Sequence, residues 1–339
     1  MARLFLAALR LAGHDVFVAS DFRSRSVAAE QAVFREEGTA RADLLAAELA
    51  SNPPDLWFTY HLYHKAPDWL GPPVAARLAI PYVVAEASFA PKQAGGPFAV
   101  GHNAVREALR CADLVLGLNP ADAECVRPRL AASERYVPLA PFVDASLYPP
   151  AAPRRRGPLR MLTAAMMRED QKQESYLVLA KALEALPGDW TLEIVGGGPA
   201  EDEIKAAFAP FGVRIAFLGI LDPEALRARY AAADLFVWPA VKEAWGMALL
   251  EAQASGLPVV AGRSGGIPDI VRDGTTGRLA PEGDAASFAA AIAAIAADRE
   301  KLAAMGAAAR ANVLAAHDLP SAARTLDRHL SALIPRRAP

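Results

Sequence analysis

Short apolar runs alternate with longer segments rich in Ala, Leu, Glu and Arg along the whole chain, and this alternation limits the fold more than any other feature. Because the runs resemble strands and the longer segments have helical period, the pattern is that of repeated βαβ units. Most runs are continuously apolar, as strands buried on both faces must be. The sequence predicts an α/β fold with strands at 14–19, 55–60, 81–85, 112–117, 134–138, 159–163, 190–195, 213–217, 234–238, 258–261 and 277–280.

A proline-rich segment, residues 138–158, divides these strands into two groups and cannot itself be a helix or a central strand. A chain of 339 residues has room for about two domains. We expect two doubly wound parallel-sheet domains facing each other across a cleft: residues 1–148, residues 149–318, and a C-terminal helix within 319–339 that packs back on the first domain. In such sheets ligands bind beyond the carboxyl ends of the strands. We therefore expect the functional site in the loops that follow the strands.

Composition excludes several classes of protein. A formal net charge of -2 lacks the basic excess of a general nucleic-acid binder, and 53% hydrophobic residues argue against global disorder. Cys111 and Cys125 are too few for a disulfide framework or a zinc cage, which favours a cytoplasmic location.

The N-terminal segment MARLFLAALRLAGHD predicts an amphipathic helix, because Arg10 interrupts its apolar run and no cleavage site follows. Arg3 and Arg10 flank the apolar face of this helix, which allows a weak peripheral membrane contact. No stretch is apolar enough for an integral membrane segment.

Two loops in the second half carry residues suited to anion binding. The segment AAMMREDQKQES places Arg168 and Lys172 just before a helix, where a merely solvated helix start is the alternative. The run Gly196–Gly198 ends a strand, and Pro199 is expected to open a helix whose free N–H groups could hold an anion. Most isolated glycine clusters are only turns, and the absence of GxGxxG disfavours an NAD oxidoreductase.

The most informative stretch is residues 235–277. It places Glu243 in a loop after a strand, Gly246 at the turn into a helix and Glu251 within that helix. Two glutamates eight residues apart are common by chance, and Glu243 alone could simply compensate a helix dipole. The pair therefore carries weight only together with the motifs around it.

Those motifs, in their order and spacing, resemble one known family. The matching elements are Arg168 with Lys172, EIVGGGP, FLGILDPEALRARYAAADLFVWPA, KEAWGMALLEAQASGLPVVA and SGGIPDIVRDGTTG. Residues 159–315 resemble the nucleotide-binding half of the GT-B retaining glycosyltransferases of family 4, and weaker similarity extends over the first half. The resemblance implies a GT-B fold whose second domain holds a nucleoside-diphosphate sugar. The first domain would hold an acceptor, which is a glycan, a lipid or a small molecule.

The resemblance also implies roles for single residues. Arg168 and Lys172 match the cations that neutralise the diphosphate, and the absence of an Asp-x-Asp motif favours transfer without a metal or other cofactor. Glu251 matches the carboxylate that accepts hydrogen bonds from the ribose, and Glu243 matches the one that holds donor-sugar hydroxyls. The base is expected near residues 217–221. Further donor-binding residues would be Gly197, Gly198, Ala244, Trp245, Gly246 and Met247.

The first half offers candidates on the acceptor side. They follow two strands, in TYHLYHKAPDW and in AEASFAPKQAGGPF. Many family members carry a functional histidine after the second of these strands, where this chain has Glu86–Ser88. An HxxH spacing without a third ligand argues against a metal site, and a buried hydrogen-bonded histidine is the alternative to acceptor binding. The candidates are His61, His64, Lys65, Glu86, Ser88 and Lys92.

The start of the chain differs from the family pattern. Members begin with a central strand and a Gly-rich loop before the first helix, whereas Met1 here stands at the start of that helix. The resemblance therefore predicts that the first domain lacks this strand and loop, and that the true start codon lies upstream.

Taken together, the sequence predicts a metal-independent retaining glycosyltransferase that uses a nucleotide-sugar donor. Two alternatives stay open: a nucleotide-sugar-binding protein without turnover, and a sugar-nucleotide epimerase of the same fold.

Overall fold

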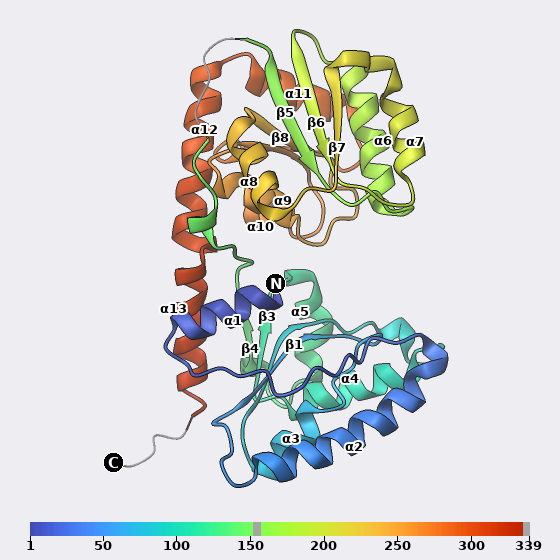
Figure 1. Ribbon diagram of the computed structural model, residues 1–339, viewed down its shortest axis with the longest axis vertical. Helices are drawn as coiled ribbons and strands as arrows, with labels where there is room; N and C mark the ends of the chain where they lie inside the picture. Colours follow the sequence, from blue (N-terminus) through green and yellow to red (C-terminus); the bar gives the residue numbers. More distant parts are fainter. Residues whose placement is uncertain (152–156, 335–339) are drawn as a thin grey trace. The chain divides into compact units, whose positions relative to one another are not determined.

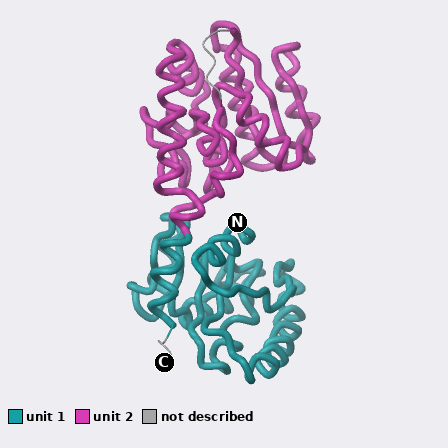
Figure 2. The backbone as a smooth tube through the Cα atoms, turned by 60° about the vertical axis from the view of Figure 1, so that its left-hand side comes forward, with its two compact units in different colours: residues 1–139, 323–339 teal, residues 140–322 magenta. Residues whose placement is uncertain are grey.

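The computed structural model describes residues 1–151 and 157–334. The chain forms two compact units, one made of residues 1–139 together with the C-terminal residues from 323 onward, the other of residues 140–322 (Figure 2). The sequence predicted these divisions at 148/149 and 318/319. The last helix, α13 (Leu319–Ser331), begins in the second unit and continues into the first, where Asp327 lies 3.6 Å from His14.

The first unit contains a four-stranded parallel sheet in the order β1-β2-β3-β4. Its strands are β1 (Trp57–Leu62), β2 (Tyr82–Ala87), β3 (Leu114–Gly117) and β4 (Tyr136–Pro138). Its helices before α13 are α1 (Ala2–Leu11), α2 (Gln31–Leu49), α3 (Gly71–Leu78), α4 (Ala99–Cys111) and α5 (Pro120–Val126) (Figure 1).

The predicted strand at 14–19 is wrong. These residues form no strand, and β1 is an edge of its sheet. Residues 14–20 instead line a cavity of about 440 Å³ together with β1, while Phe17 and Val18 are exposed. The run therefore does not pair with the free edge of β1, and nothing in its local sequence distinguishes it from the runs that do form strands.

The amphipathic helix predicted at the N-terminus is present as α1. Its apolar face is buried within the first unit: Phe5 is 2% exposed, and its ring lies 5.7 Å from that of Phe58 and 5.4 Å from that of Tyr60. This face is therefore not free to enter a membrane, contrary to the expected peripheral contact. Among the described residues, no helix is long and apolar enough to cross a membrane.

The second unit contains a six-stranded parallel sheet in the order β10-β9-β8-β5-β6-β7. Its strands are β5 (Leu159–Ala164), β6 (Trp190–Val195), β7 (Ile215–Gly219), β8 (Leu235–Trp238), β9 (Val259–Gly262) and β10 (Gly277–Ala280). The helices around it are α6 (Gln171–Glu184), α7 (Glu201–Phe208), α8 (Pro223–Ala232), α9 (Met247–Ala254), α10 (Ile267–Ile270), α11 (Ala285–Ala296) and α12 (Arg299–Asn312) (Figure 1).

Ten of the eleven predicted strands correspond to β1 through β10, with ends displaced by at most two residues. The reason is burial on both faces: Val237 in β8 and Val260 in β9 have no exposed surface. Burying each such side chain stabilises the fold by roughly 1.5–3 kcal/mol. Continuously apolar runs therefore strongly favour the interior of the sheet. The prediction of two parallel-sheet α/β domains is confirmed; the four strands described in the first sheet follow chain order, whereas the second sheet is doubly wound.

Strand order in the second sheet reverses between β5 and β8, because the chain leaves β5 for β6 on one side and returns to β8 on the other. In open α/β sheets, ligands bind beyond the carboxyl ends of the strands at the point where the strand order reverses. This place in the fold holds the residues described next.

Candidate active site

Lys172 and Glu243 meet at the point where the strand order reverses. Lys172 lies in the first turn of α6, Glu243 lies in the loop between β8 and α9, and the Lys172 ammonium contacts Glu243 Oε2. The Trp238 ring supports both, since its Nε1 donates to the same oxygen at 3.3 Å and its centroid lies 5.5 Å from Lys172 Nζ. The structure therefore brings together two side chains that the sequence separates by 71 residues.

This ion pair is largely withdrawn from water, because each side chain is only 14% exposed. Removing one partner of such a pair leaves an uncompensated charge and costs about 3–5 kcal/mol. An ammonium carries three N–H donors, so Lys172 can contact Glu243 and still donate to an anionic ligand. The contact with Glu243 therefore holds the Lys172 ammonium in place and still leaves it N–H donors for a ligand.

The loop before α9 has an unusual backbone. Ala240 (φ 54°), Lys242 (φ 49°) and Gly246 (φ 63°) all lie in the left-handed region. A non-glycine residue held there costs on the order of 1–3 kcal/mol, and such residues gather at functional sites. At Gly246 a Cβ would also lie 2.6 Å from Ile267 Cδ1, so a larger residue there would have to displace this side-chain end.

Three backbone N–H groups of this loop are held by side chains from three different segments. Ser175 of α6, Glu282 after β10 and Ser264 after β9 accept hydrogen bonds from Val241, Lys242 and Glu243, at 2.9, 2.8 and 3.2 Å. The loop is therefore fixed before any ligand arrives. It leads directly into α9, which begins at Met247 and whose first N–H groups have no partner within the helix.

Arg168 lies in the loop after β5, where its Nε is 3.1 Å from Asp170 Oδ2. Asp170 also caps α6 by accepting from the Lys172 N–H at 2.8 Å. The Arg168 side chain is 46% exposed, so its pairing with Asp170 holds it only weakly. Arg168 is therefore a solvent-accessible cation in the loop that leads into α6, the helix whose first turn carries Lys172.

The glycines after β6 are required for packing between two loops. A Cβ at Gly196 would lie 1.9 Å from the Ala165 oxygen, and one at Gly198 would lie 2.4 Å from the Met167 oxygen. The Met167 N–H donates to the Gly197 oxygen at 3.0 Å. Close approach to the loop after β5 therefore explains these glycines without a ligand.

The helix after this glycine run differs from the prediction. It begins at Glu201 rather than Pro199, and its first turn holds Glu201, Asp202 and Glu203. These carboxylates already compensate the positive end of the helix dipole. The predicted anion site at this helix start is therefore disfavoured.

Glu251 projects from α9 toward two tyrosines. The Tyr230 hydroxyl donates to Glu251 Oε2 at 3.0 Å, and the Tyr148 hydroxyl also hydrogen-bonds to this carboxylate. Burial raises the pKa of Glu251 and outweighs the opposite effect of the two tyrosine hydrogen bonds. Because each carboxylate oxygen accepts more than one hydrogen bond, Glu251 retains capacity for ligand hydroxyls.

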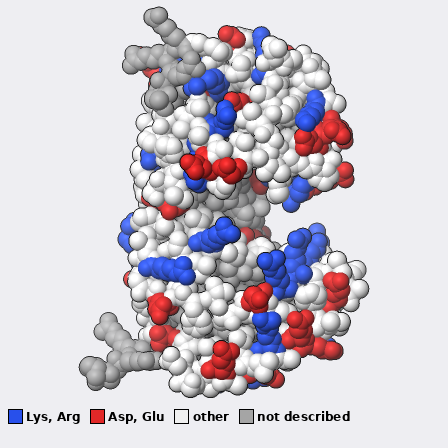
Figure 3. Space-filling view, in the orientation of Figure 1, with Lys and Arg blue, Asp and Glu red and all other residues white. Residues whose placement is uncertain are grey.

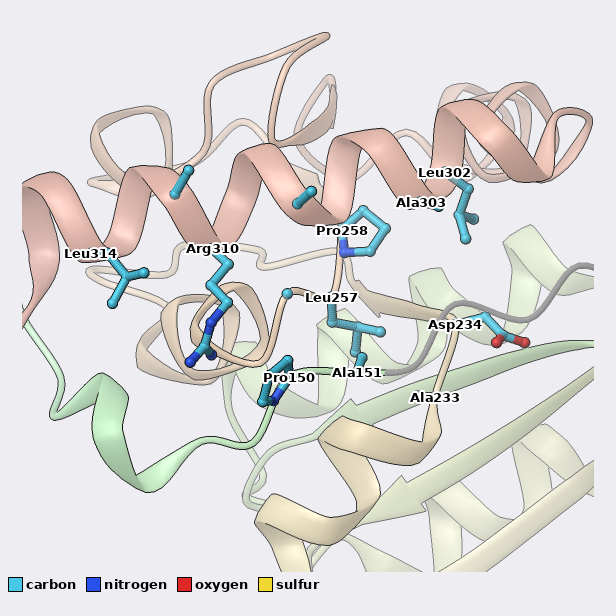
Figure 4. A pocket seen from close by; sticks show the side chains of 13 residues that line it. Pro150, Ala151, Ala233, Asp234, Leu257, Pro258, Leu302, Ala303, Arg310 and Leu314 are labelled. Atoms are coloured by element: carbon cyan, nitrogen blue, oxygen red, sulfur yellow. The ribbon is translucent and has the colours of Figure 1, made fainter.

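A second cavity, of about 350 Å³, lies at the other end of the second sheet (Figure 4). Asp234 and Pro258, which line it, directly precede β8 and β9. Asp234 is bound by Arg160 at 3.1 Å and Arg299 at 3.5 Å, and Arg310 donates to the Tyr148 oxygen at 2.9 Å. These residues tie structural elements together at the amino ends of the strands, away from the candidate site.

In the first unit, the predicted His61 and Glu86 are brought together, with His61 Nδ1 3.4 Å from Glu86 Oε1. Tyr60 hydrogen-bonds to the same carboxylate, and the predicted Ser88 hydrogen-bonds to Asp122 of α5. Sequence reasoning missed Asp122. The rule that loops after strands carry the site could have found it, because Asp122 follows β3 in GLNPAD.

The remaining predicted residues of this unit lie elsewhere. The His64 ring lies 5.3 Å from that of Phe98, Lys65 Nζ lies 5.4 Å from the same ring, and Lys92 belongs to a short exposed turn. Burial, followed by the Lys65 charge, lowers the pKa of His64. His61 and His64 do not converge on a metal site: over residues 1–151 and 157–334 no three His, Cys, Asp or Glu side chains are grouped to hold an ion.

Acidic and basic side chains are interspersed on the face shown in Figure 3. This distribution agrees with the formal net charge of -2.

Comparison with known proteins finds similarity for most of the second unit. Residues 153–312 match the family described as "Glycosyl transferases group 1". Sulfoquinovosyl transferase SQD2 of Arabidopsis thaliana is 36% identical over 141 residues, which are 41% of this chain and 27% of that protein. A GDP-mannose-dependent alpha-(1-6)-phosphatidylinositol monomannoside mannosyltransferase of Mycolicibacterium smegmatis is 39% identical over 131 residues, 36% of this chain and 34% of that protein. The matched parts thus span about a third or less of these two relatives.

Solved structures show the fold. A glycosyltransferase from Rickettsia africae aligns with a TM-score of 0.77 at 15% identity, over 99% of this chain and 95% of that chain. A sucrose-phosphate synthase from Thermosynechococcus elongatus aligns with a TM-score of 0.69 at 22% identity, over 88% and 78%. HepE of Anabaena, in complex with UDP and glucose, aligns with a TM-score of 0.67 at 21% identity, over 86% and 82%. The chain therefore has the GT-B fold, and its residues 153–312 are similar to the group 1 glycosyltransferases.

Proposed function

We propose that this protein transfers a sugar from a nucleoside-diphosphate sugar to a hydroxyl acceptor, and that the second unit binds the donor. The observation that carries the proposal is the buried contact between Lys172 and Glu243, next to the start of α9 and at the strand-order reversal. The match of residues 153–312 to a transferase family supports the same activity.

Lys172 and Arg168 are proposed to neutralise the diphosphate. Negative charge grows on this leaving group as the bond to the sugar breaks, so a fixed cation favours the transition state over the bound donor. The backbone N–H groups of the segment Ala244–Met247, which leads into α9, would add donors for phosphate or sugar oxygens. Each hydrogen bond between charged groups contributes roughly 1.5–3 kcal/mol.

The two glutamates are proposed to hold hydroxyl groups of the donor. Glu251, steadied by Tyr230 and Tyr148, would accept hydrogen bonds from the ribose, whose neighbouring hydroxyls suit a carboxylate. Glu243 would accept from the transferred sugar. Gly197 and Gly198 would contribute backbone at the edge of the site.

We further propose transfer with retention of anomeric configuration and without a metal. The family resemblance of the motifs around Glu243 and Glu251 supports retention. The lack of an Asp-x-Asp motif, with Arg168 and Lys172 available as cations, supports the absence of a metal requirement.

The test is to measure nucleotide release from UDP-, GDP- and ADP-sugars. Arg168→Ala should lower the rate about ten-fold or more, because it removes a charged hydrogen-bond donor to the leaving group. Arg229→Ala is the matched control, since that arginine is 44% exposed and also pairs with one carboxylate, Glu193. Its rate should equal that of the wild-type protein.

Four outcomes contradict the proposal. Failure to bind any donor, or unchanged rates in both Arg168→Ala and Glu251→Ala, would show that the proposed donor site does not exist. Donor binding without release would indicate a nucleotide-sugar-binding protein. Interconversion of the donor sugar with no acceptor present would indicate an epimerase.

A further inference from the structure

One buried tryptophan contacts both members of the pair of Lys172 and Glu243. Trp238 is the last residue of β8, pairs with Ala261 of β9 and is 2% exposed. Its Nε1 donates to Glu243 Oε2 at 3.3 Å, and the Lys172 ammonium lies over its ring, 5.5 Å from the centroid. The indole therefore holds the anion through its N–H and the cation through its face.

The Trp238 ring is itself fixed by its surroundings. Tyr176 lies one turn after Lys172 in α6, and its ring meets that of Trp238 edge to face, with centroids 4.9 Å apart and planes at 75°. This arrangement is one that aromatic pairs prefer. Tyr176 is completely buried, and its hydroxyl donates to the Ala165 oxygen at 2.8 Å. The packing around β8 therefore sets the position of the indole N–H before a ligand binds.

Both contacts of the Glu243 carboxylate fall on the same oxygen. The Lys172 ammonium and Trp238 Nε1 each contact Oε2. Within residues 1–151 and 157–334, no group hydrogen-bonds to Oε1. The Glu243 side chain keeps 14% of its surface exposed. The carboxylate is therefore turned with one oxygen toward the protein, and the other oxygen keeps its capacity as an acceptor.

An indole suits this position because it donates a hydrogen bond without bringing a charge. A second lysine or an arginine beside Oε2 would compete with Lys172 for the carboxylate, whereas a phenyl or aliphatic side chain would offer no donor. Trp238 therefore orients Glu243 while the charges of Lys172 and Glu243 still balance each other.

We propose that Trp238 is a positioning residue for the donor sugar. Its N–H keeps Glu243 Oε2 directed at Lys172, so that Oε1 is presented to a hydroxyl of the transferred sugar. Trp238 is buried and acts only through Glu243. This inference rests on the proposed transferase function. It predicts that the indole N–H contributes to recognition of the sugar but not of the nucleoside diphosphate.

Trp238→Phe tests this role, because phenylalanine keeps an aromatic ring beside Lys172 and lacks the N–H. Trp190→Phe is the matched control. Trp190 is also 2% exposed, its Nε1 also donates at 3.3 Å, to the Leu186 oxygen, and Arg214 lies 5.0 Å from its ring centroid. Trp190 is the first residue of β6, so it lies at the amino end of the sheet. The two variants lose the same kind of hydrogen bond at opposite ends of the strands.

The kinetic readouts are kcat/KM for nucleotide release from the best donor and the Kd of the corresponding nucleoside diphosphate. Trp238→Phe should lower kcat/KM about five- to ten-fold, as expected for the loss of one hydrogen bond, and should leave the Kd unchanged. Trp190→Phe should change neither. Equal kcat/KM in the two variants, or equal weakening of donor and diphosphate in Trp238→Phe, would overturn the proposal.

An NMR measurement on the ligand-free protein tests the geometry even if Trp238→Phe does not fold. With isotope-labelled tryptophan, the indole N–H signal of Trp238 is assigned by replacing the other tryptophans in turn. Glu243→Gln should shift this signal, because the N–H then meets a neutral acceptor, and should leave the Trp190 signal in place. An unchanged Trp238 signal would show that its N–H does not hold Glu243.

Donor binding separates this inference from the proposed function. If the wild-type protein binds nucleotide sugars but releases no nucleotide, the transferase function fails, and Trp238→Phe should still weaken the nucleotide sugar and not the nucleoside diphosphate. If release occurs and Trp238→Phe behaves as Trp190→Phe does, the transferase function stands and the positioning role fails. Failure to bind any donor would contradict both.

Discussion

The ammonium of Lys172 and the carboxylate of Glu243 contact each other in a place from which water is largely excluded, although they come from different βα segments of the second sheet. The contact sets a balance of charge that a single substitution would upset. The stability of the second unit should therefore depend on both side chains being present.

Lys172→Met and Glu243→Gln should each lower the free energy of unfolding, by about 3 kcal/mol, because each leaves the other charge buried without its partner. The double variant should lose less than the sum of the two single losses. Urea denaturation of the four proteins measures this coupling. Additive losses would show that the two side chains do not stabilise each other.

Gly198→Ala should destabilise the protein by about 3 kcal/mol, since it adds a methyl group against the Met167 oxygen in addition to straining a positive φ. Gly188→Ala is the control, because Gly188 also has a positive φ but has nothing within 4 Å of its added Cβ. That control should lose only about 1–2 kcal/mol. Equal losses by thermal or urea unfolding would mean that the close approach between the two loops does not limit position 198.

Glu251→Gln should stabilise the ligand-free protein at neutral pH and weaken its binding of nucleoside diphosphates. Burial raises the pKa of Glu251 above 4.5, so the folded state holds its proton more tightly than the unfolded state does. The stability that this carboxyl contributes is complete below pH 4.5 and is lost as the pH rises through the folded-state pKa. A neutral amide avoids that loss, but it cannot replace the carboxylate as an acceptor for two hydroxyls.

The measurements for this variant are the melting temperature from pH 4 to pH 8 and the affinity for UDP, GDP and ADP. The wild-type protein should lose stability relative to the variant toward higher pH. A melting-temperature difference that does not change with pH would contradict the raised pKa.

His317→Gln should flatten the loss of stability on mild acidification. His317 is buried, and Nδ1 lies 2.8 Å from the Pro141 oxygen. Burial lowers its pKa, against the opposite effect of this hydrogen bond. The contribution of His317 is therefore complete above pH 6.5 and is lost as the pH falls through the lower folded-state pKa.

Urea unfolding at several pH values between 5 and 8 tests this. Arg272 and Asp269 also act on His317, so Asp269→Asn is a useful companion that should lower its pKa further. An acid-induced loss of the same size in His317→Gln and in the wild-type protein would show that other groups cause it.

The sequence predicted most of the sheet, because residues such as Val237 and Val260 must be apolar to be buried on both faces. It failed at 14–19, where a run with an apolar stretch does not pair with the free edge of β1. It also placed a helix start at Pro199 from local preference, whereas the helix begins at Glu201 once the glycine loop has packed against the loop after β5.

For the candidate site, the sequence indicated Lys172, Glu243 and Glu251 but could not show which of them touch. The contact between Lys172 and Glu243 spans 71 residues and arises from the strand order of the sheet. The tyrosines that hold Glu251 lie 21 residues away or further and carry no local signal. The left-handed backbone at His61 and Glu86 could not be predicted. Sequence reasoning expects this conformation at glycine, whereas here the tertiary structure imposes it on other residues.

In the second unit, the residues around Asp234 that stabilise the fold and the residues proposed for chemistry lie at opposite ends of the sheet. Arg160 and Arg299 secure Asp234 at the amino ends of the strands, whereas the chemistry is proposed for the loops at their carboxyl ends. Substitutions in one set of residues can therefore accumulate with little effect on the other. Such a fold can change its substrates by altering loops while its resistance to unfolding is maintained elsewhere, and an engineer could improve either property separately.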